Sequence, residues 1–265
     1  MSGSRDQRER QHCALLVEYD GARFQGWSRQ PDAISIEGAV LAALAALKLE
    51  DPVVRCAGRT DAGVHAIGQV LSLSYEGPIP VERIRPALNG DLPNDICIMD
   101  AHACSPEFDA RACALSRSYE YRVLSSSVHS PLRRNRVFHQ PRQLDTAMLD
   151  RAAAAVVGQH DFTAFTPSQT KHRYFHRTVL DSRWERVDDE LHYRIRGKNF
   201  LRHMVRVLVG TMLAVGRGDM ELEHFLYLLE GATRDEAHNT APAHALTLTG
   251  VEYDDAWGLP ASWVR

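Results

Sequence analysis

The sequence has 265 residues, enough for one large domain or two ordinary domains. Its hydrophobic share of 44% and charged share of 25% are typical of a soluble globular protein, and no apolar run approaches the roughly 18 residues of a membrane span, so the composition excludes a membrane protein. The formal net charge of −3 excludes a chain that is basic throughout.

The first half of the chain predicts four strands and two helices in the order β-α-β-β-α-β. Residues 1–11 are polar and lack the apolar core of a signal peptide, so we expect a disordered leader there. Strands are expected where short apolar or alternating runs end in turn-forming residues, and helices where apolar residues recur at helical spacing. The expected strands are 12–20, 52–58, 69–76 and 95–103, and the expected helices are 35–50, with Ser35 as N-cap, and 81–89, which Pro86 should cut or kink.

The second half predicts the same order again with longer elements. The expected strands are 118–125, 177–187, 190–197 and 245–253, and the expected helices are 144–158, 199–216 and 220–231. Two copies of this order favour an α+β fold of two ferredoxin-like (RRM-like) halves, with their sheets joined around a central RNA-binding cleft. We therefore expect an N-terminal domain over 12–106 and a C-terminal domain over 107–265.

Positive charge is concentrated in the middle of the chain. Residues 111–206 contain 18 Lys and Arg against 9 Asp and Glu, whereas the remaining residues contain 13 against 25. A basic middle on an otherwise acidic chain is typical of a surface that binds a polyanion, and the planar guanidinium of arginine suits phosphates and bases. A solvated basic face remains the alternative.

Several kinds of chemistry lack a motif here. The five cysteines are odd in number and include no CxxC pair, which argues against a disulfide framework or a zinc ribbon and favours reduced thiols in the cytoplasm. The sequence has no phosphate-binding loop, dinucleotide fingerprint, GxSxG or HExxH motif. His172 and His176 stand four apart, but no second ligand pair accompanies them, so no metal site is expected.

The stretch GRTDAGVHA, residues 58–66, holds Asp61 between two glycines. Glycine permits backbone conformations that other residues avoid, so a tight bend is expected around this aspartate. Taken alone, the stretch is more typical of an ordinary turn than of a reactive carboxylate.

Matches elsewhere in the chain favour the second interpretation. The stretch resembles the active-site motif of the tRNA pseudouridine synthase A family, and the resemblance extends over roughly residues 13–254. The further matching stretches are YDGARFQGW (19–27), ALNGDLPNDI (87–96), FDARACA (108–114), RSYEY (117–121), HDFTAF (160–165), NFLRHMVRVLVGTMLAVGRG (199–218) and APAHALTLTGVEYD (241–254). The chain departs from the family pattern at Ser28, Ala112, Leu180 and Ala245, where Gln, an aromatic residue, Arg and Gly are usual.

The resemblance implies an isomerase that converts uridine to pseudouridine in RNA and requires no cofactor. It implies that Asp61 is the nucleophile and that Arg206 pairs with it across the cleft between the two halves. It also implies that Tyr119 stacks on the uracil, and that Arg59 fills the place of the base that has been flipped out. Whether Asp61 attacks C1′ or reacts through the base stays open.

The resemblance further implies a homodimer that modifies uridines 38–40 in the anticodon arm of tRNA, in the cytoplasm, with no membrane and no metal. Candidate phosphate contacts are Arg111, Arg117, Arg122, Arg133, Arg134, Lys198 and Arg202. Two alternatives stay open: a sister pseudouridine synthase with another RNA target, and an RNA-binding protein without catalytic activity.

Overall fold

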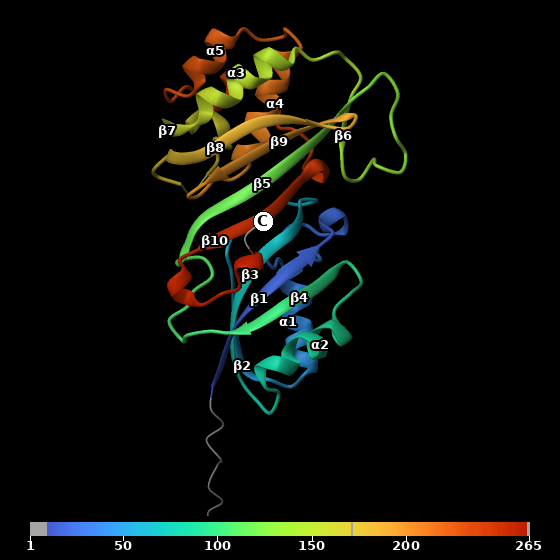
Figure 1. Cartoon of the computed structure of the whole chain (residues 1–265), viewed down its shortest axis with the longest axis vertical. Helices are drawn as coiled ribbons and strands as arrows, with labels where there is room; N and C mark the ends of the chain where they lie inside the picture. Colours follow the sequence, from blue (N-terminus) through green and yellow to red (C-terminus); the bar gives the residue numbers. More distant parts are fainter. Residues whose placement is uncertain (1–9, 171, 264–265) are drawn as a thin grey trace, which may run out of the picture. The chain divides into compact units, whose positions relative to one another are not determined.

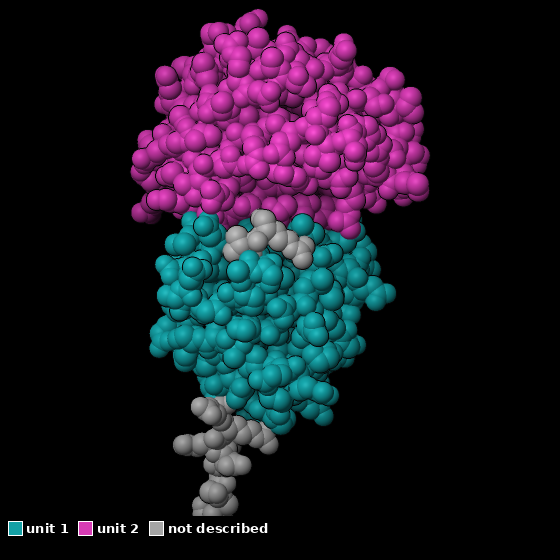
Figure 2. Space-filling model, in the orientation of Figure 1, with its two compact units in different colours: residues 1–60, 66–115, 250–265 teal, residues 61–65, 116–249 magenta. Residues whose placement is uncertain are grey.

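The computed structural model describes residues 10–170 and 172–263, which fall into two compact units (Figure 2). Unit 1 comprises the described residues within 1–60, 66–115 and 250–265, and unit 2 those within 61–65 and 116–249. This division differs from the expected boundary between residues 106 and 107. The chain leaves unit 1 after Leu115 and returns to it at Gly250. Of the expected leader, residues 1–9 lie outside the described residues, and Gln11 begins the first strand.

Unit 1 follows the predicted element order. Its elements are β1 (Gln11–Tyr19), α1 (Ile36–Ala46), β2 (Glu50–Cys56), most of β3 (His65–Glu76), α2 (Val81–Asp91) and β4 (Ile96–Ala103) (Figure 1). The strands pair in the order β4-β1-β3, β2 also pairs with β3, and all three pairings are antiparallel. Helix α2 packs on β1 and β4, and α1 packs on α2.

Strand β1 is buried on both of its sides, which explains why it is a continuous apolar run rather than an alternating one. Ala14 and Leu16 belong to a core cluster with Phe108 and Trp263. The indole Nε1 of Trp263 donates a 2.9 Å hydrogen bond to Asp100. The C-terminal segment is therefore part of the unit 1 core.

The helices of unit 1 differ in length from the prediction. Ser35 caps α1 as expected, since its hydroxyl accepts a hydrogen bond from the amide of Gly38. The helix ends at Ala46 rather than at residue 50, and Lys48 has a left-handed backbone with φ 54°. Helix α2 continues through Pro86 to Asp91, so the predicted cut at this proline was wrong. Because Pro86 has no amide proton, the carbonyl of Glu82 four residues earlier lacks its helical donor, and the helix tolerates this single loss.

Unit 2 contains the predicted strands and helices together with two short strands that were not predicted. Its elements are β5 (Ala114–Ser125), β6 (Phe138–Gln140), α3 (Thr146–Val156), β7 (Gly158–Asp161), β8 (His176–Val187), β9 (Glu190–Gly197), α4 (Met204–Gly216), α5 (Leu222–Leu228) and β10 (Leu246–Tyr253). Both β5 and β10 begin in one unit and end in the other. The strand order is β10-β5-β9-β8-β7, and β6 pairs with β5 in parallel. The three helices pack against one another, and α3 contacts β8.

Helix α4 begins at Met204, five residues after the predicted start at residue 199, because His203 has a left-handed backbone with φ 61° and stops the helix from extending towards the N-terminus. Nearly every residue of α4 is buried, so it is the central helix of unit 2. Among the helices of the described residues, none combines the length and the apolarity that crossing a membrane demands.

Candidate active site

The backbone that leads to Asp61 is fixed by a buried glutamine that the sequence analysis did not single out. The side-chain Nε2 of Gln69 donates a hydrogen bond to the backbone carbonyl of Gly58 at 2.7 Å. Its Oε1 accepts a hydrogen bond from the backbone amide of Gly58 at 3.3 Å. Next to this pair, the hydroxyl of Tyr19 lies 2.8 Å from that of Thr60. Gln69 is fully buried, so both of its hydrogen bonds are shielded from water.

Asp61 is the first residue of a tight turn. The amide of Val64 donates to the carbonyl of Asp61 at 3.2 Å, and Gly63 has φ 77°. A residue with a Cβ is strained at that φ, so the second glycine of the motif is required by the turn. The turn belongs to unit 2, where Gly63 lies against the side chain of Ala243.

The carboxylate of Asp61 pairs with the guanidinium of Arg206 on α4. Arg206 donates from Nη1 to Oδ2 of Asp61 at 3.0 Å and from Nε to the carbonyl of Ala241 at 2.9 Å. The Asp61 side chain is 25% exposed and that of Arg206 16% exposed. The sequence analysis expected this pair to link two halves of the molecule; both residues lie in unit 2.

A glycine of α4 allows the segment that orients Arg206 to lie close to the helix. A Cβ added at Gly210 would come within 1.9 Å of the carbonyl oxygen of Asn239. Two residues later in that segment, the amide of Ala241 donates to the carbonyl of Arg206 at 3.0 Å. The close packing at Gly210 therefore sets the position of the 239–241 backbone, and that backbone in turn orients the guanidinium of Arg206.

His203 lies against the same carboxylate and was not proposed from the sequence. Its Nε2 is 3.7 Å from Oδ1 of Asp61, which is beyond hydrogen-bond distance. Burial lowers the pKa of His203 and outweighs the opposing effect of Asp61, and the cations Arg206, Arg202 and Arg234 lower it further. These effects favour the neutral form of the imidazole. The only signal in the sequence was its place directly before the apolar run of α4.

Tyr119 and Tyr121 point to the same side of β5. Tyr119 is 8% exposed, and its ring meets Phe200 edge-on with 5.2 Å between the ring centroids. Tyr121 is fully buried, donates from its hydroxyl to the carbonyl of Pro242 at 3.0 Å, and has a pKa raised by burial. Tyr121 is thus the core residue of the two. Arg59 is exposed and belongs to unit 1.

Three of the arginines expected to contact phosphates form hydrogen bonds with other groups of the protein. Arg122 and Arg133 both bind the buried carboxylate of Glu190. Arg122 donates from Nε at 2.8 Å, and Arg133 donates from Nη1 at 2.8 Å. Arg117 is 9% exposed and donates to the carbonyl of Lys198 at 2.9 Å. These contacts make structural roles the more direct explanation for the three side chains.

The remaining candidates for phosphate contact are at the surface. Arg134 is exposed and donates to the carbonyl of Pro131 at 2.8 Å. The other exposed candidates are Arg111, Lys198 and Arg202. Within residues 10–170 and 172–263, no three His, Cys, Asp or Glu side chains gather as a metal site would require.

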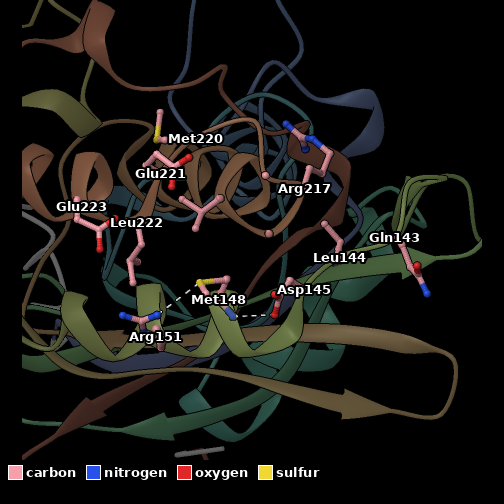
Figure 3. A pocket seen from close by; sticks show the side chains of 13 residues that line it. Gln143, Leu144, Asp145, Met148, Arg151, Arg217, Met220, Glu221, Leu222 and Glu223 are labelled. Carbon is pink, nitrogen blue, oxygen red and sulfur yellow. Dashed lines mark hydrogen bonds between the residues drawn. The ribbon is translucent and has the colours of Figure 1, made fainter.

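Unit 2 also has an open pocket of about 720 Å³ between α3 and the residues around the end of α4 (Figure 3). Met148 and Arg151 line it from α3, and Arg217, Met220 and Glu223 line it from the opposite side. No site residue expected from the sequence lines this pocket.

The contacts of Asp61 suit nucleophilic chemistry. One carboxylate oxygen accepts a hydrogen bond from a guanidinium that is itself anchored to backbone, so the carboxylate has one orientation and a cation beside it. The other oxygen faces the imidazole of His203 without a hydrogen bond to it. A carboxylate held in this way can form a bond to carbon.

The chain is similar to proteins of a known family. A model of the tRNA pseudouridine synthase family matches residues 15–111 and 152–254. A tRNA pseudouridine synthase A of Solibacter usitatus is 39% identical over 242 residues, which cover 90% of this chain and 98% of the relative. Another from Chloroflexus aurantiacus is 39% identical over 247 residues, covering 91% and 88%. A solved Cbf5-Nop10-Gar1 complex aligns with 89% of this chain and 48% of its own, at 13% identity and a TM-score of 0.36, which is too low to define a shared fold.

Proposed function

This chain belongs to the tRNA pseudouridine synthase family, and we propose that Asp61 is the nucleophile of its reaction. The protein is an isomerase that converts uridine to pseudouridine in tRNA. The N1–C1′ glycosidic bond breaks, the uracil turns, and C5 bonds to C1′. The hydrogen on C5 leaves as a proton and N1 gains one, so substrate and product have the same atoms.

The observation that carries the role of Asp61 is its contact with Arg206. The hydrogen bond between Nη1 and Oδ2 places a fixed positive charge beside the carboxylate. That charge attracts the carboxylate and holds it in place when the substrate displaces water from the site. We propose that Asp61 acts either at C1′ or through the base, as the sequence analysis left open.

Tyr119 and Arg59 are each proposed to act on the substrate nucleotide. Tyr119 is held edge-on by Phe200 and is proposed to stack on the uracil while the glycosidic bond is broken. Arg59 precedes Asp61 by two residues and is exposed, as is required of a side chain that enters a base stack. Its role is to fill the place that the flipped nucleotide leaves.

The substrate positions, the assembly and the phosphate contacts are proposed as well. We propose that the substrate positions are uridines 38–40 of the anticodon arm, and that the enzyme is a cytoplasmic homodimer. Arg111, Arg134, Lys198 and Arg202 are proposed phosphate contacts, while Arg117, Arg122 and Arg133 stabilise the fold. We also propose that each unit is a ferredoxin-like half, which the antiparallel order β4-β1-β3-β2 of unit 1 supports.

Tritium release from tRNA that carries label at C5 of uridine tests the role of Asp61. Asp61→Asn keeps the size of the side chain but removes its charge, so we expect release to be lost while tRNA binding is kept. Asp219→Asn is the matched control, because Asp219 is also a carboxylate paired with arginine in unit 2. Equal release by wild type and Asp61→Asn contradicts the proposal. Release by neither refutes the activity itself.

A further inference from the structure

The segment before β8 presents aromatic and basic side chains at the surface of unit 2. Tyr174 is 62% exposed, and its ring stacks on that of His176 with 5.2 Å between centroids and 22° between planes. His172 and Arg173, which precede this pair, are exposed as well. From residue 162 to residue 180 the sequence has no Asp or Glu, while it contains Lys171, Arg173 and Arg177.

This aromatic pair is held in place by its own segment. Arg177 donates from Nη1 to the carbonyls of Tyr174 and His176, at 3.0 and 2.7 Å. The amide of Phe162 donates to the carbonyl of Phe175 at 3.2 Å. The segment around an exposed aromatic ring is often mobile, but here hydrogen bonds fix the backbone on both sides of the ring. The backbone that carries the ring is therefore held in place while the ring faces solvent.

The same segment is attached to the turn that precedes α4. The amide of Lys198 donates to the carbonyl of Thr178 at 3.1 Å. The hydroxyl of Thr166, on the other side of the aromatic pair in sequence, donates to the carbonyl of Arg202 at 3.0 Å. His203 and Arg206 follow this turn directly and contact Asp61. The aromatic pair and the proposed nucleophile thus belong to one connected framework within unit 2.

We propose that Tyr174 and His176 form a stacking platform for an unpaired base of the tRNA substrate. The proposal rests on the function proposed above. The carboxylate of Asp161 lies 4.0 Å from Nδ1 of His176, while Arg173 and Arg177 flank Tyr174 in the chain. An exposed aromatic face with arginines next to it has the properties of single-strand binding surfaces, where a base stacks on the ring and arginine meets the phosphates. A protein partner with an acidic surface would need the cations but not the aromatic ring.

Binding measurements separate these alternatives. The probes are an RNA stem-loop and a blunt RNA duplex with the sequence of its stem, each bound to the full chain. Tyr174→Ala should weaken binding of the stem-loop by about tenfold, because stacking of one base is lost, and should leave duplex binding unchanged. Tyr174→Phe keeps the ring and should bind both probes like wild type. Arg173→Ala should weaken both probes and reduce the salt dependence of binding, since it removes a phosphate contact.

Tyr227→Ala is the matched control, because Tyr227 is 48% exposed and lies against His224, but its neighbours on α5 include Glu223 rather than arginines. It should bind the stem-loop like wild type. Wild-type affinity of Tyr174→Ala for the stem-loop, or equal weakening with the duplex, overturns the platform. Failure of the function proposal looks different, since wild type would then release no tritium whatever the binding results.

Discussion

Arg206 donates a hydrogen bond from Nη1 to Oδ2 of Asp61 at 3.0 Å, across 145 residues of sequence. The same guanidinium donates from Nε to the carbonyl of Ala241. Because two nitrogens of the guanidinium are hydrogen-bonded, the arginine fixes the position of the carboxylate and also places a positive charge beside it. The rigidity of the pair should therefore matter for the reaction as well as its charge.

Replacing Arg206 should lower the rate without removing tRNA binding. Arg206→Lys keeps a positive charge but lacks a planar fork that bonds Asp61 and Ala241 together. We expect its kcat for tritium release to fall by roughly 100-fold, because the carboxylate is no longer fixed. Arg217→Ala removes another arginine that pairs with an aspartate in the same unit, and should retain wild-type kcat. An Arg206→Lys enzyme as fast as wild type would show that charge is sufficient.

The role of His203 should lie in its backbone rather than in its imidazole. The 3.7 Å separation from Asp61 is too long for a hydrogen bond, whereas φ 61° determines where α4 begins. Asparagine tolerates left-handed backbone better than alanine does, so His203→Asn should retain activity and stability. His203→Ala should lower the free energy of unfolding by about 1 kcal/mol and reduce kcat. Loss of activity in His203→Asn with an unchanged melting temperature would instead assign a function to the imidazole.

Gly210→Ala should damage both stability and activity. A Cβ at this position would collide with the backbone of Asn239, so the 239–241 segment must move away from α4. We expect a loss of about 2 kcal/mol in the free energy of unfolding, together with lower kcat because Ala241 anchors Arg206. Gly90→Ala is the control: it lies on α2 with no atom near the added Cβ, and should stabilise the protein by about 0.5 kcal/mol. Equal stability of the two variants would contradict the proposed close packing.

Glu190 should contribute stability that depends on pH. Burial alone would raise the pKa of Glu190, but hydrogen bonds from Arg122 and Arg133 outweigh burial and lower it. Since the pKa is lower in the folded state, the stabilisation is present above the unfolded value of about 4.3 and is lost as the pH falls through the folded value. Glu190→Gln should therefore cost about 2 kcal/mol at neutral pH, and this difference from wild type should shrink under acid conditions.

Chemical denaturation at several pH values measures this difference. Glu185→Gln is the control, since Glu185 pairs with Arg183 and Arg194 but is 35% exposed, and exposed pairs contribute little. A Glu190→Gln penalty that stays constant down to the acid range would show that the arginines do not act through its charge.

The cysteines should differ sharply in reactivity. Burial raises the pKa of Cys13 and of Cys56 to about 12, and that of Cys104 to about 11, so their thiolate forms are scarce near neutral pH. Cys97 is exposed. Alkylation of the native protein followed by peptide mass analysis should therefore modify Cys97 first and leave Cys13 and Cys56 unmodified until the protein unfolds. Rapid labelling of Cys13 in the native protein would show that the unit 1 core opens.

Local patterns in the sequence were sufficient for most of the elements. Period-two alternation and apolar runs located the long strands, because a strand buried on one or both faces must carry that pattern. The short strands β6 and β7 have three and four residues, too few for any periodicity to appear. The start of α4 was misplaced because 199–203 continues the helical composition, while the left-handed backbone of His203 is fixed by its surroundings rather than by its residue type.

By itself, the sequence determined the family, the candidate nucleophile and the glycine-flanked turn, since these depend on residues that are neighbours in the chain. The tertiary structure alone decided that His203 lies beside Asp61, which arginines bind Glu190, and that the 239–241 backbone packs on Gly210. Such contacts join residues far apart in sequence, and their geometry follows from how helices and strands pack. No local pattern of residue types encodes that packing. The sequence therefore does not show whether a basic side chain contacts a carboxylate, a carbonyl or solvent.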